Sequence, residues 1–117
     1  MNNQLDILDY QGEGYKPIVD FGAWRVAFLR CEERLAHLKK LERHMETDEV
    51  FVLLEGKATL YIGLEKEPYE MEPHKMYNVR QAVWHAIVVS PDAKVLIVEN
   101  RDTTEQNSAG ELSELLG

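Results

Sequence analysis

The stretch His44-Met45-Glu46-Thr47-Asp48-Glu49-Val50-Phe51-Val52-Leu53-Leu54-Glu55-Gly56, together with Val83-Trp84-His85, decides the fold of this chain. It places a histidine and three acidic residues directly before an apolar run that ends at a glycine. A second histidine then lies in another apolar run well downstream. An antiparallel barrel brings such distant segments together around one dry cavity, where metal binding and proton transfer take place.

The rest of the chain reads as short apolar runs separated by turn signals. Expected strands cover residues 18–21, 24–29, 50–54, 58–64, 69–71, 82–89 and 94–99. We expect 50–54 and 58–64 to form a hairpin around Glu55-Gly56-Lys57, and 82–89 to pair with 94–99 across a second turn. Strands at this even spacing predict an all-β sandwich or closed barrel rather than a βαβ fold.

Two segments are less regular. Within residues 32–45, Leu35, Leu38, Leu41 and Met45 recur near helical spacing, yet residues 38–44 also fit a charged edge strand, which we favour. Residues 103–117 are predicted to be a mobile tail, with a terminal helical turn at 111–116. The 117 residues are predicted to form one domain.

Composition excludes several classes of protein. Thirteen basic and 21 acidic residues give a net charge of −8, which argues against nucleic-acid partners and anionic membrane surfaces. No apolar run is long enough to span a bilayer, and the N-terminus does not resemble a signal peptide. The lone Cys31 cannot form an internal disulfide. We therefore expect a cytoplasmic protein.

At these residues the chain resembles a single-domain cupin, over residues 38–99. Glu49, six intervening residues and Gly56 match the end of the first cupin motif, and His85 matches the histidine of the second. The resemblance implies a double-stranded β-helix, that is, a jelly-roll barrel. In metal-dependent cupins, three histidines and one glutamate bind a divalent metal.

The match to the family's metal ligands is incomplete. The first two histidine positions fall on Arg43 and Met45, and a loop shorter by one residue would instead bring in His44 and Glu46. At most two of the three family histidines are therefore present. The second motif lacks its usual glycine, and His74 lies near that position. It also lacks its usual proline, and Arg80 stands about where that proline is expected.

The candidate metal ligands are His44, Glu49 and His85, and the candidate acid–base residues are Glu46 and Glu49. Imidazole and carboxylate suit manganese, iron, zinc or nickel, and the small number of imidazoles favours manganese or iron. The same residues without metal could act as acid and base, because an apolar surround raises the pKa of a carboxyl. A buried His–Glu hydrogen bond of purely structural value is the third interpretation.

Other residues receive secondary roles. Tyr61, Tyr77 and Arg80 are candidate ligand-binding residues, with Arg80 able to hold a carboxylate. Trp84 faces away from His85 along its strand and predicts a partner-subunit contact, hence a homodimer. His37 and His74 are expected at the surface.

The sequence thus predicts a protein that binds a small polar metabolite, such as a sugar derivative or an organic acid, in the barrel. The enzymatic version is a metal-dependent lyase, isomerase or dioxygenase, and Val83-Trp84-His85 is faintly similar to cupin-type ureidoglycolate lyases. The alternative is a non-catalytic, metal-free ligand-binding module.

Overall fold

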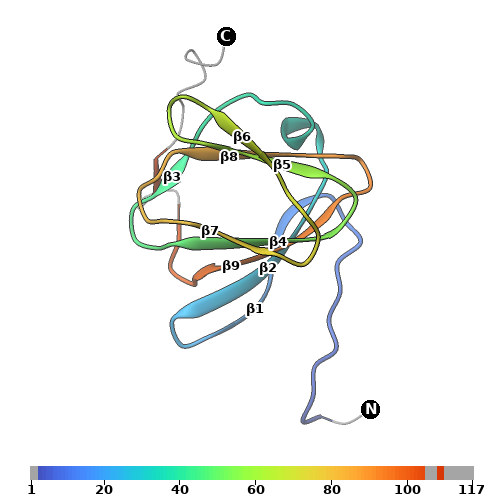
Figure 1. Ribbon diagram of the computed structural model, residues 1–117. Helices are drawn as coiled ribbons and strands as arrows, with labels where there is room; N and C mark the ends of the chain where they lie inside the picture. The colour runs from blue at the N-terminus through green and yellow to red at the C-terminus, as the bar shows by residue number, and fades with distance from the viewer. Residues whose placement is uncertain (1–2, 105–107, 110–117) are drawn as a thin grey trace.

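In the computed structural model, which describes residues 3–104 and 108–109, two antiparallel sheets face each other (Figure 1). The larger sheet has the order β1-β2-β9-β4-β7, the smaller has the order β6-β5-β8, and β3 pairs with β10. The strands are β1 (Gly14–Phe21), β2 (Trp24–Arg30), β3 (Arg43–His44), β4 (Glu49–Glu55), β5 (Ala58–Ile62), β6 (Glu67–Glu70), β7 (Met76–Val79), β8 (His85–Val89), β9 (Lys94–Asn100) and β10 (Ser108–Ala109).

Most of the strands were predicted, but two predicted pairings are wrong. β4 and β5 lie in different sheets, and so do β8 and β9. The glycine turn at 55–57 and the turn at 90–93 therefore carry the chain from one sheet to the other instead of closing hairpins. True hairpins join β1 to β2 and β5 to β6.

The two crossing turns are fastened to each other. The Ser90 amide donates to the Lys57 carbonyl at 2.9 Å, and the Lys57 amide donates to the Ser90 hydroxyl at 2.9 Å. Gly56 has φ +73°, and a Cβ there would lie 2.7 Å from Ala93 Cα. Glycine is required at this position by both the backbone conformation and the close approach.

Strand boundaries also differ from the predictions. The strand expected at 82–89 begins only at His85, because Ala82 has a positive φ of 65° in the turn before it. β1 begins earlier than expected, at Gly14, and β7 was not predicted.

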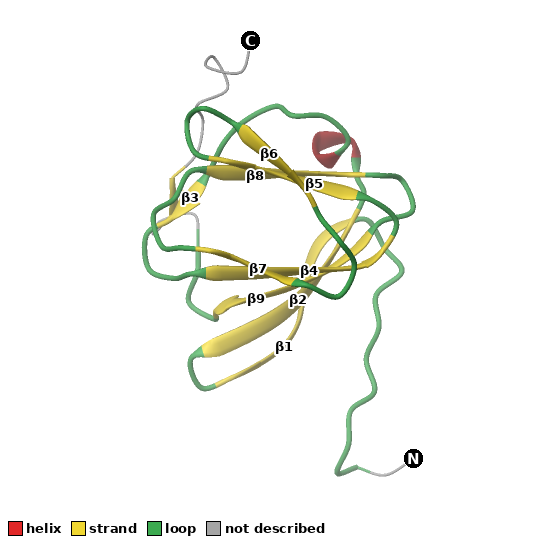
Figure 2. Ribbon diagram, viewed as in Figure 1, coloured by secondary structure: helices red, strands yellow, loops and turns green. Residues whose placement is uncertain are grey.

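The strand favoured at 38–44 is mostly wrong. A short 3-10 helix, Glu33–Leu35, is followed by irregular chain (Figure 2). Pairing begins only at Glu42, which forms a single β-bridge with His85, and continues at Arg43–His44, which pairs with Ser108–Ala109. Leu35 and Leu41 are buried, so the apolar spacing that suggested a helix serves to anchor a loop. Residues 111–116 lie outside the described residues, as does most of the predicted mobile tail at 103–117.

The apolar core fills the space between the two sheets. Alternate residues of β4 and β9 point into it, with Phe51, Leu53, Val95 and Ile97 all buried. Among the described residues no helix is long and apolar enough to cross a membrane. One end of this core is polar, and the candidate site lies there.

Candidate functional site

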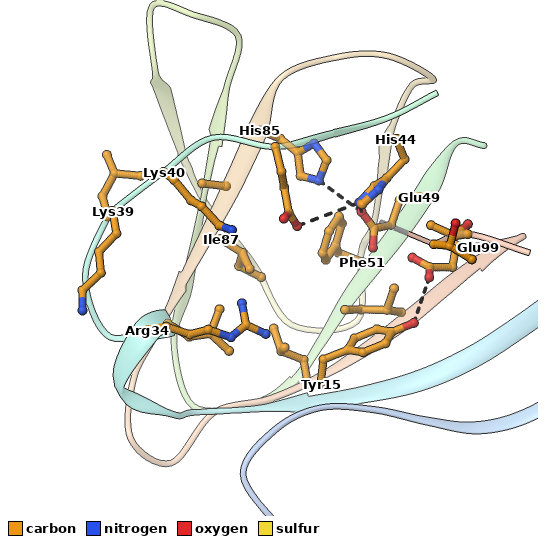
Figure 3. Close-up of a pocket in the computed structure, with 18 of the residues that line it drawn as sticks. Tyr15, Arg34, Lys39, Lys40, His44, Glu49, Phe51, His85, Ile87 and Glu99 are labelled. Atoms are coloured by element: carbon orange, nitrogen blue, oxygen red, sulfur yellow. Dashed lines mark hydrogen bonds and ion pairs between the residues drawn. The ribbon is translucent and has the colours of Figure 1, made fainter. Parts of the chain in front are cut away.

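A cavity of about 770 Å³ opens between the sheets and contains the predicted histidines and glutamate (Figure 3). Its lining combines buried ionisable groups with aliphatic side chains. The lining residues are Tyr15, Arg25, Leu29, Arg34, Leu35, His37, Leu38, Lys39, Lys40, Glu42, His44, Glu49, Phe51, His85, Ala86, Ile87, Ile97, Glu99, Thr103 and Thr104.

Both histidines converge on one oxygen of Glu49. His44 Nε2 and His85 Nε2 each lie 3.1 Å from Glu49 Oε1. Glu49 is 6% exposed and His85 is 2% exposed, so this contact is shielded from bulk water. We call these three residues the His–Glu centre.

The local backbone explains why three distant segments meet. Glu49 is the first residue of β4 and shares its inward face with Phe51 and Leu53. Glu42 and His85 exchange two backbone hydrogen bonds of 2.8 Å, and the Ala82 amide donates to the His44 carbonyl at 2.9 Å. These bonds fix the segment carrying His44 against the start of β8.

The environment of His85 restricts its protonation. Its Nδ1 lies 2.9 Å from the Val83 carbonyl oxygen, which can only accept a hydrogen bond, so Nδ1 carries the proton. A neutral His85 then has a lone pair on Nε2, facing a carboxylate oxygen. That pair of acceptors requires either a second proton on the imidazole or a cation between them.

Electrostatics favour the ionised forms of Glu49 and His44. Burial alone would raise the pKa of Glu49, but the hydrogen bonds with His44 and His85 outweigh it and hold the pKa well below its usual range. Burial opposes a charged imidazole at His44, yet the hydrogen bond and the charge of Glu49 raise its pKa. The carboxylate is therefore an anion at neutral pH.

A second carboxyl group, Glu99, stands beside the first. One oxygen each from Glu49 and Glu99 lies within 4.8 Å of a His44 nitrogen and of each other. The Tyr15 hydroxyl donates to Glu99 Oε2 at 2.8 Å, and the Arg25 guanidinium forms an ion pair with the same oxygen. Burial, followed by the hydrogen bond and charge of Glu49, raises the pKa of Glu99 to about 7 despite the opposing effect of Arg25.

The sequence analysis missed Glu99, Tyr15 and Arg25. One signal was available for Glu99, since it continues the alternation of buried Val95 and Ile97 along β9. An acidic residue at an inward position of an apolar strand indicates a functional site.

The structure does not bring the other predicted residues to the His–Glu centre. Glu46 is exposed and is not among the residues lining the cavity. Tyr77 and Arg80 line a separate cavity of about 340 Å³, and Tyr61 lines neither of the two. Glu99, and not Glu46, is therefore the second carboxyl beside Glu49.

The structure also places the other aromatic and histidine residues that the sequence analysis singled out. Trp84 is half-buried and stacks under the Arg43 guanidinium, 4.5 Å from ring centroid to Cζ. His74 is exposed in a turn, with φ 70°. His37 is exposed but contributes to the lining of the cavity.

Comparison of the sequence with protein-family models and with curated proteins finds no match. Solved structures do match. A cupin-2 domain containing protein from Shewanella frigidimarina is 20% identical over 80% of this chain and 85% of its own, with a TM-score of 0.63. Streptomyces Pac13, described as a unique nucleoside dehydratase, is 10% identical over 86% and 81%, with a TM-score of 0.64. KdgF from Halomonas sp. is 16% identical over 86% and 91%, with a TM-score of 0.62. At these identities the likeness shows a shared fold.

Proposed function

Since the chain has the cupin fold, the all-β jelly roll that its sequence predicts, we propose that it is a metabolite-binding enzyme with a divalent metal at the His–Glu centre. The ligands would be His44, Glu49 and His85. The observation that carries the proposal is the convergence of two imidazole nitrogens on one buried carboxylate oxygen, both at 3.1 Å.

The residues present fit a metal ion in two respects. Each imidazole nitrogen lies 3.1 Å from the Glu49 oxygen, a separation that two ligands of one ion can have, and the sets Glu42, His44, His85 and His44, Glu49, Glu99 each bring three ligand atoms within 4.8 Å of one another. The Nδ1 contact of His85 with a backbone carbonyl is also the outer contact that metal-bound histidines usually make.

The donor set favours manganese or iron, as the sequence predicts. The two imidazoles are joined by the Glu49 oxygen, and Glu42 places a further carboxylate oxygen within 4.8 Å of a His44 nitrogen. Oxygen-rich sites with two histidines suit these metals better than zinc.

When bound, the metal would polarise a carbonyl or hydroxyl oxygen of the substrate. Glu99 would hold or release a proton at its carboxyl oxygen, and Tyr15 would keep that carboxyl oriented. A site with a proton-transfer group beside the ligands favours a lyase or isomerase over a dioxygenase. The description of Pac13 as a dehydratase, which is a lyase, supports the same class.

A metal-free ligand-binding module is the second candidate. It is favoured by the raised pKa of His44, since a protonated imidazole satisfies Glu49 without any ion. In that case both histidines donate to Glu49 and the cavity binds its ligand without chemistry.

Metal analysis separates the two candidates. We expect protein purified without chelators and loaded with manganese to retain about one ion per chain after desalting, as a single closed site requires. His85→Ala should lose the ion, whereas His74→Ala, which removes an exposed histidine outside the cavity, should keep it. Retention of the ion by His85→Ala, or no retention by the wild type with any of the four metals, would overturn the metal proposal.

The homodimer and the cytoplasmic location stay predictions. The homodimer rested on an outward Trp84, and in the structure this side chain is partly covered by Arg43. Light scattering of the purified chain measures the oligomeric state directly.

A further inference from the structure

The cavity has a basic end that the proposed chemistry does not use. Four basic side chains line it: Arg34 from the 3-10 helix, and His37, Lys39 and Lys40 from the irregular segment that follows. Glu49 and Glu99 lie at the other end, near the two histidines (Figure 3), and Glu42 lies 3.9 Å from His44. Apart from Arg25, which is ion-paired with Glu99, the lining is therefore divided by charge.

Two of the basic groups are directed into the cavity. Figure 3 shows the Lys40 side chain reaching toward Ile87 and the Arg34 guanidinium extending toward Tyr15, whereas Lys39 points away. Arg34 forms an ion pair through Nε with Glu32, which orients the guanidinium and leaves its terminal nitrogens toward the cavity. Lys40 forms no salt bridge with any described residue.

A group of basic residues at one cavity is unexpected in a chain with a net negative charge. Acidic residues outnumber basic ones 21 to 13, so a basic rim does not follow from composition. The basic groups are exposed, while Glu49 and Glu99 are buried at 6% and 7% exposure. A ligand that enters the cavity therefore meets the exposed basic residues first, and the inner end of the ligand meets the His–Glu centre.

An apolar band separates the two charged ends. Phe51 and Ile87 lie between them (Figure 3), and Leu35 adds to the apolar lining. A ligand that matches all three zones has an anionic group at one end, a carbon skeleton in the middle and an oxygen function at the inner end.

From this division we infer that the ligand is a small organic anion, held by its carboxylate or phosphate on Arg34 and Lys40. The inference rests on the proposed use of this cavity for the metabolite, but not on the metal. It also moves the anion-binding role that the sequence assigned to Arg80, in the other cavity, to a different segment. Arg34 supplies a planar fork for two anion oxygens, and Lys40 supplies a mobile point charge.

The test is an NMR titration of the full, metal-depleted chain with inorganic phosphate and, separately, with malonate, at constant ionic strength. We expect saturable shifts of the backbone amides of residues 34–40 with at least one of the two anions. The anion that binds more tightly distinguishes a phosphate from a carboxylate ligand.

Variants identify the residues responsible. Each exposed charge removed should weaken binding about threefold, so Arg34→Gln/Lys40→Gln should weaken it about tenfold. Lys75→Gln removes one positive charge from an exposed turn outside the cavity and should leave the affinity unchanged. Equal affinity of the wild type and the double variant, or shifts that do not saturate or lie outside residues 34–40, would overturn the inference.

The outcome is separable from that of the proposed function. His85→Ala tests metal binding and leaves the basic end intact, so it should bind the anions as the wild type does. Anion binding in a chain that never retains metal would overturn the metal site alone, and metal retention without anion binding would overturn this inference alone.

Discussion

Replacement of Glu49 by glutamine tests the His–Glu centre most directly, because the amide keeps the shape of the side chain and removes its charge. In the metal-free protein the carboxylate is 6% exposed and contacts both imidazoles at 3.1 Å. A hydrogen bond to a charged group contributes about 1.5–3 kcal/mol. Two such bonds that share one oxygen are not additive, so Glu49→Gln should lower the free energy of unfolding by about 2–4 kcal/mol.

Metal adds a second difference between the two proteins. An ion present at about 100 times its Kd stabilises a folded protein by about 2.7 kcal/mol. The wild type should gain this increment on addition of manganese, and Glu49→Gln should gain little, because the amide is a neutral and weaker ligand. Urea unfolding at neutral pH, first with a chelator and then with manganese, measures both quantities.

Matched controls make the result decisive. Glu46→Gln removes an equal charge from an exposed position nearby in the sequence and should change neither quantity by more than about 0.5 kcal/mol. The reasoning fails if Glu49→Gln unfolds like the wild type in chelator. The metal assignment fails separately if manganese stabilises Glu49→Gln as much as the wild type.

Three further predictions concern the turns, the loop and the effect of pH. Gly56→Ala should destabilise the fold by at least about 1 kcal/mol in urea unfolding, because the left-handed backbone and the 2.7 Å approach to Ala93 both oppose a Cβ. Gly22→Ala, where a Cβ would meet nothing within 4 Å, should destabilise it less, and equal losses of stability would refute the packing argument. Leu41→Ala should lower the free energy of unfolding by about 2–5 kcal/mol, because Leu41 is 0% exposed even though its segment is irregular. A loss below about 1 kcal/mol would show that Leu41 does not anchor the loop. The pKa of Glu99 is raised from 4.5 to about 7, so this group contributes stability that is complete below about pH 4.5 and is lost as the pH rises through about 7. In thermal melts over this window the wild type should lose at most about 3 kcal/mol more stability than Glu99→Gln, and parallel pH profiles of the two proteins would contradict the shift.

Local patterns predicted the strands but not how they pair. The apolar runs around Gly56 and around Ser90 to Ala93 are read correctly as strand, turn, strand. The same turn residues serve a hairpin and a crossing between sheets, and local sequence does not distinguish the two. The difference arises from the contact between the two turns, where Lys57 and Ser90 exchange hydrogen bonds across a long separation in sequence.

The candidate site was predictable in its centre and not in its surroundings. His44, Glu49 and His85 share a motif-like context, and parity along the strands places Glu49 and His85 inward. Glu46 would point to the same face as His44 only if the strand continued beyond His44. Instead β3 ends at His44 and Glu46 is exposed. Parity arguments therefore hold within a strand and fail at its end.

The segment that sequence analysis resolved least is the one that determines what the cavity can hold. Residues 36–40 lie in no helix or strand, so their side-chain directions follow from the buried anchors Leu35 and Leu41 rather than from periodicity. Between these anchors the chain can turn successive residues to different sides, which is how Lys40 faces the cavity while Lys39 points away (Figure 3). A strand over 38–44 would also have alternated these two lysines, but it would have fixed the spacing of Lys40 from the His–Glu centre by strand geometry. In an anchored loop that spacing can change with loop length while the sheets stay the same, so under the proposed function the loop would set ligand size and the sheets the chemistry.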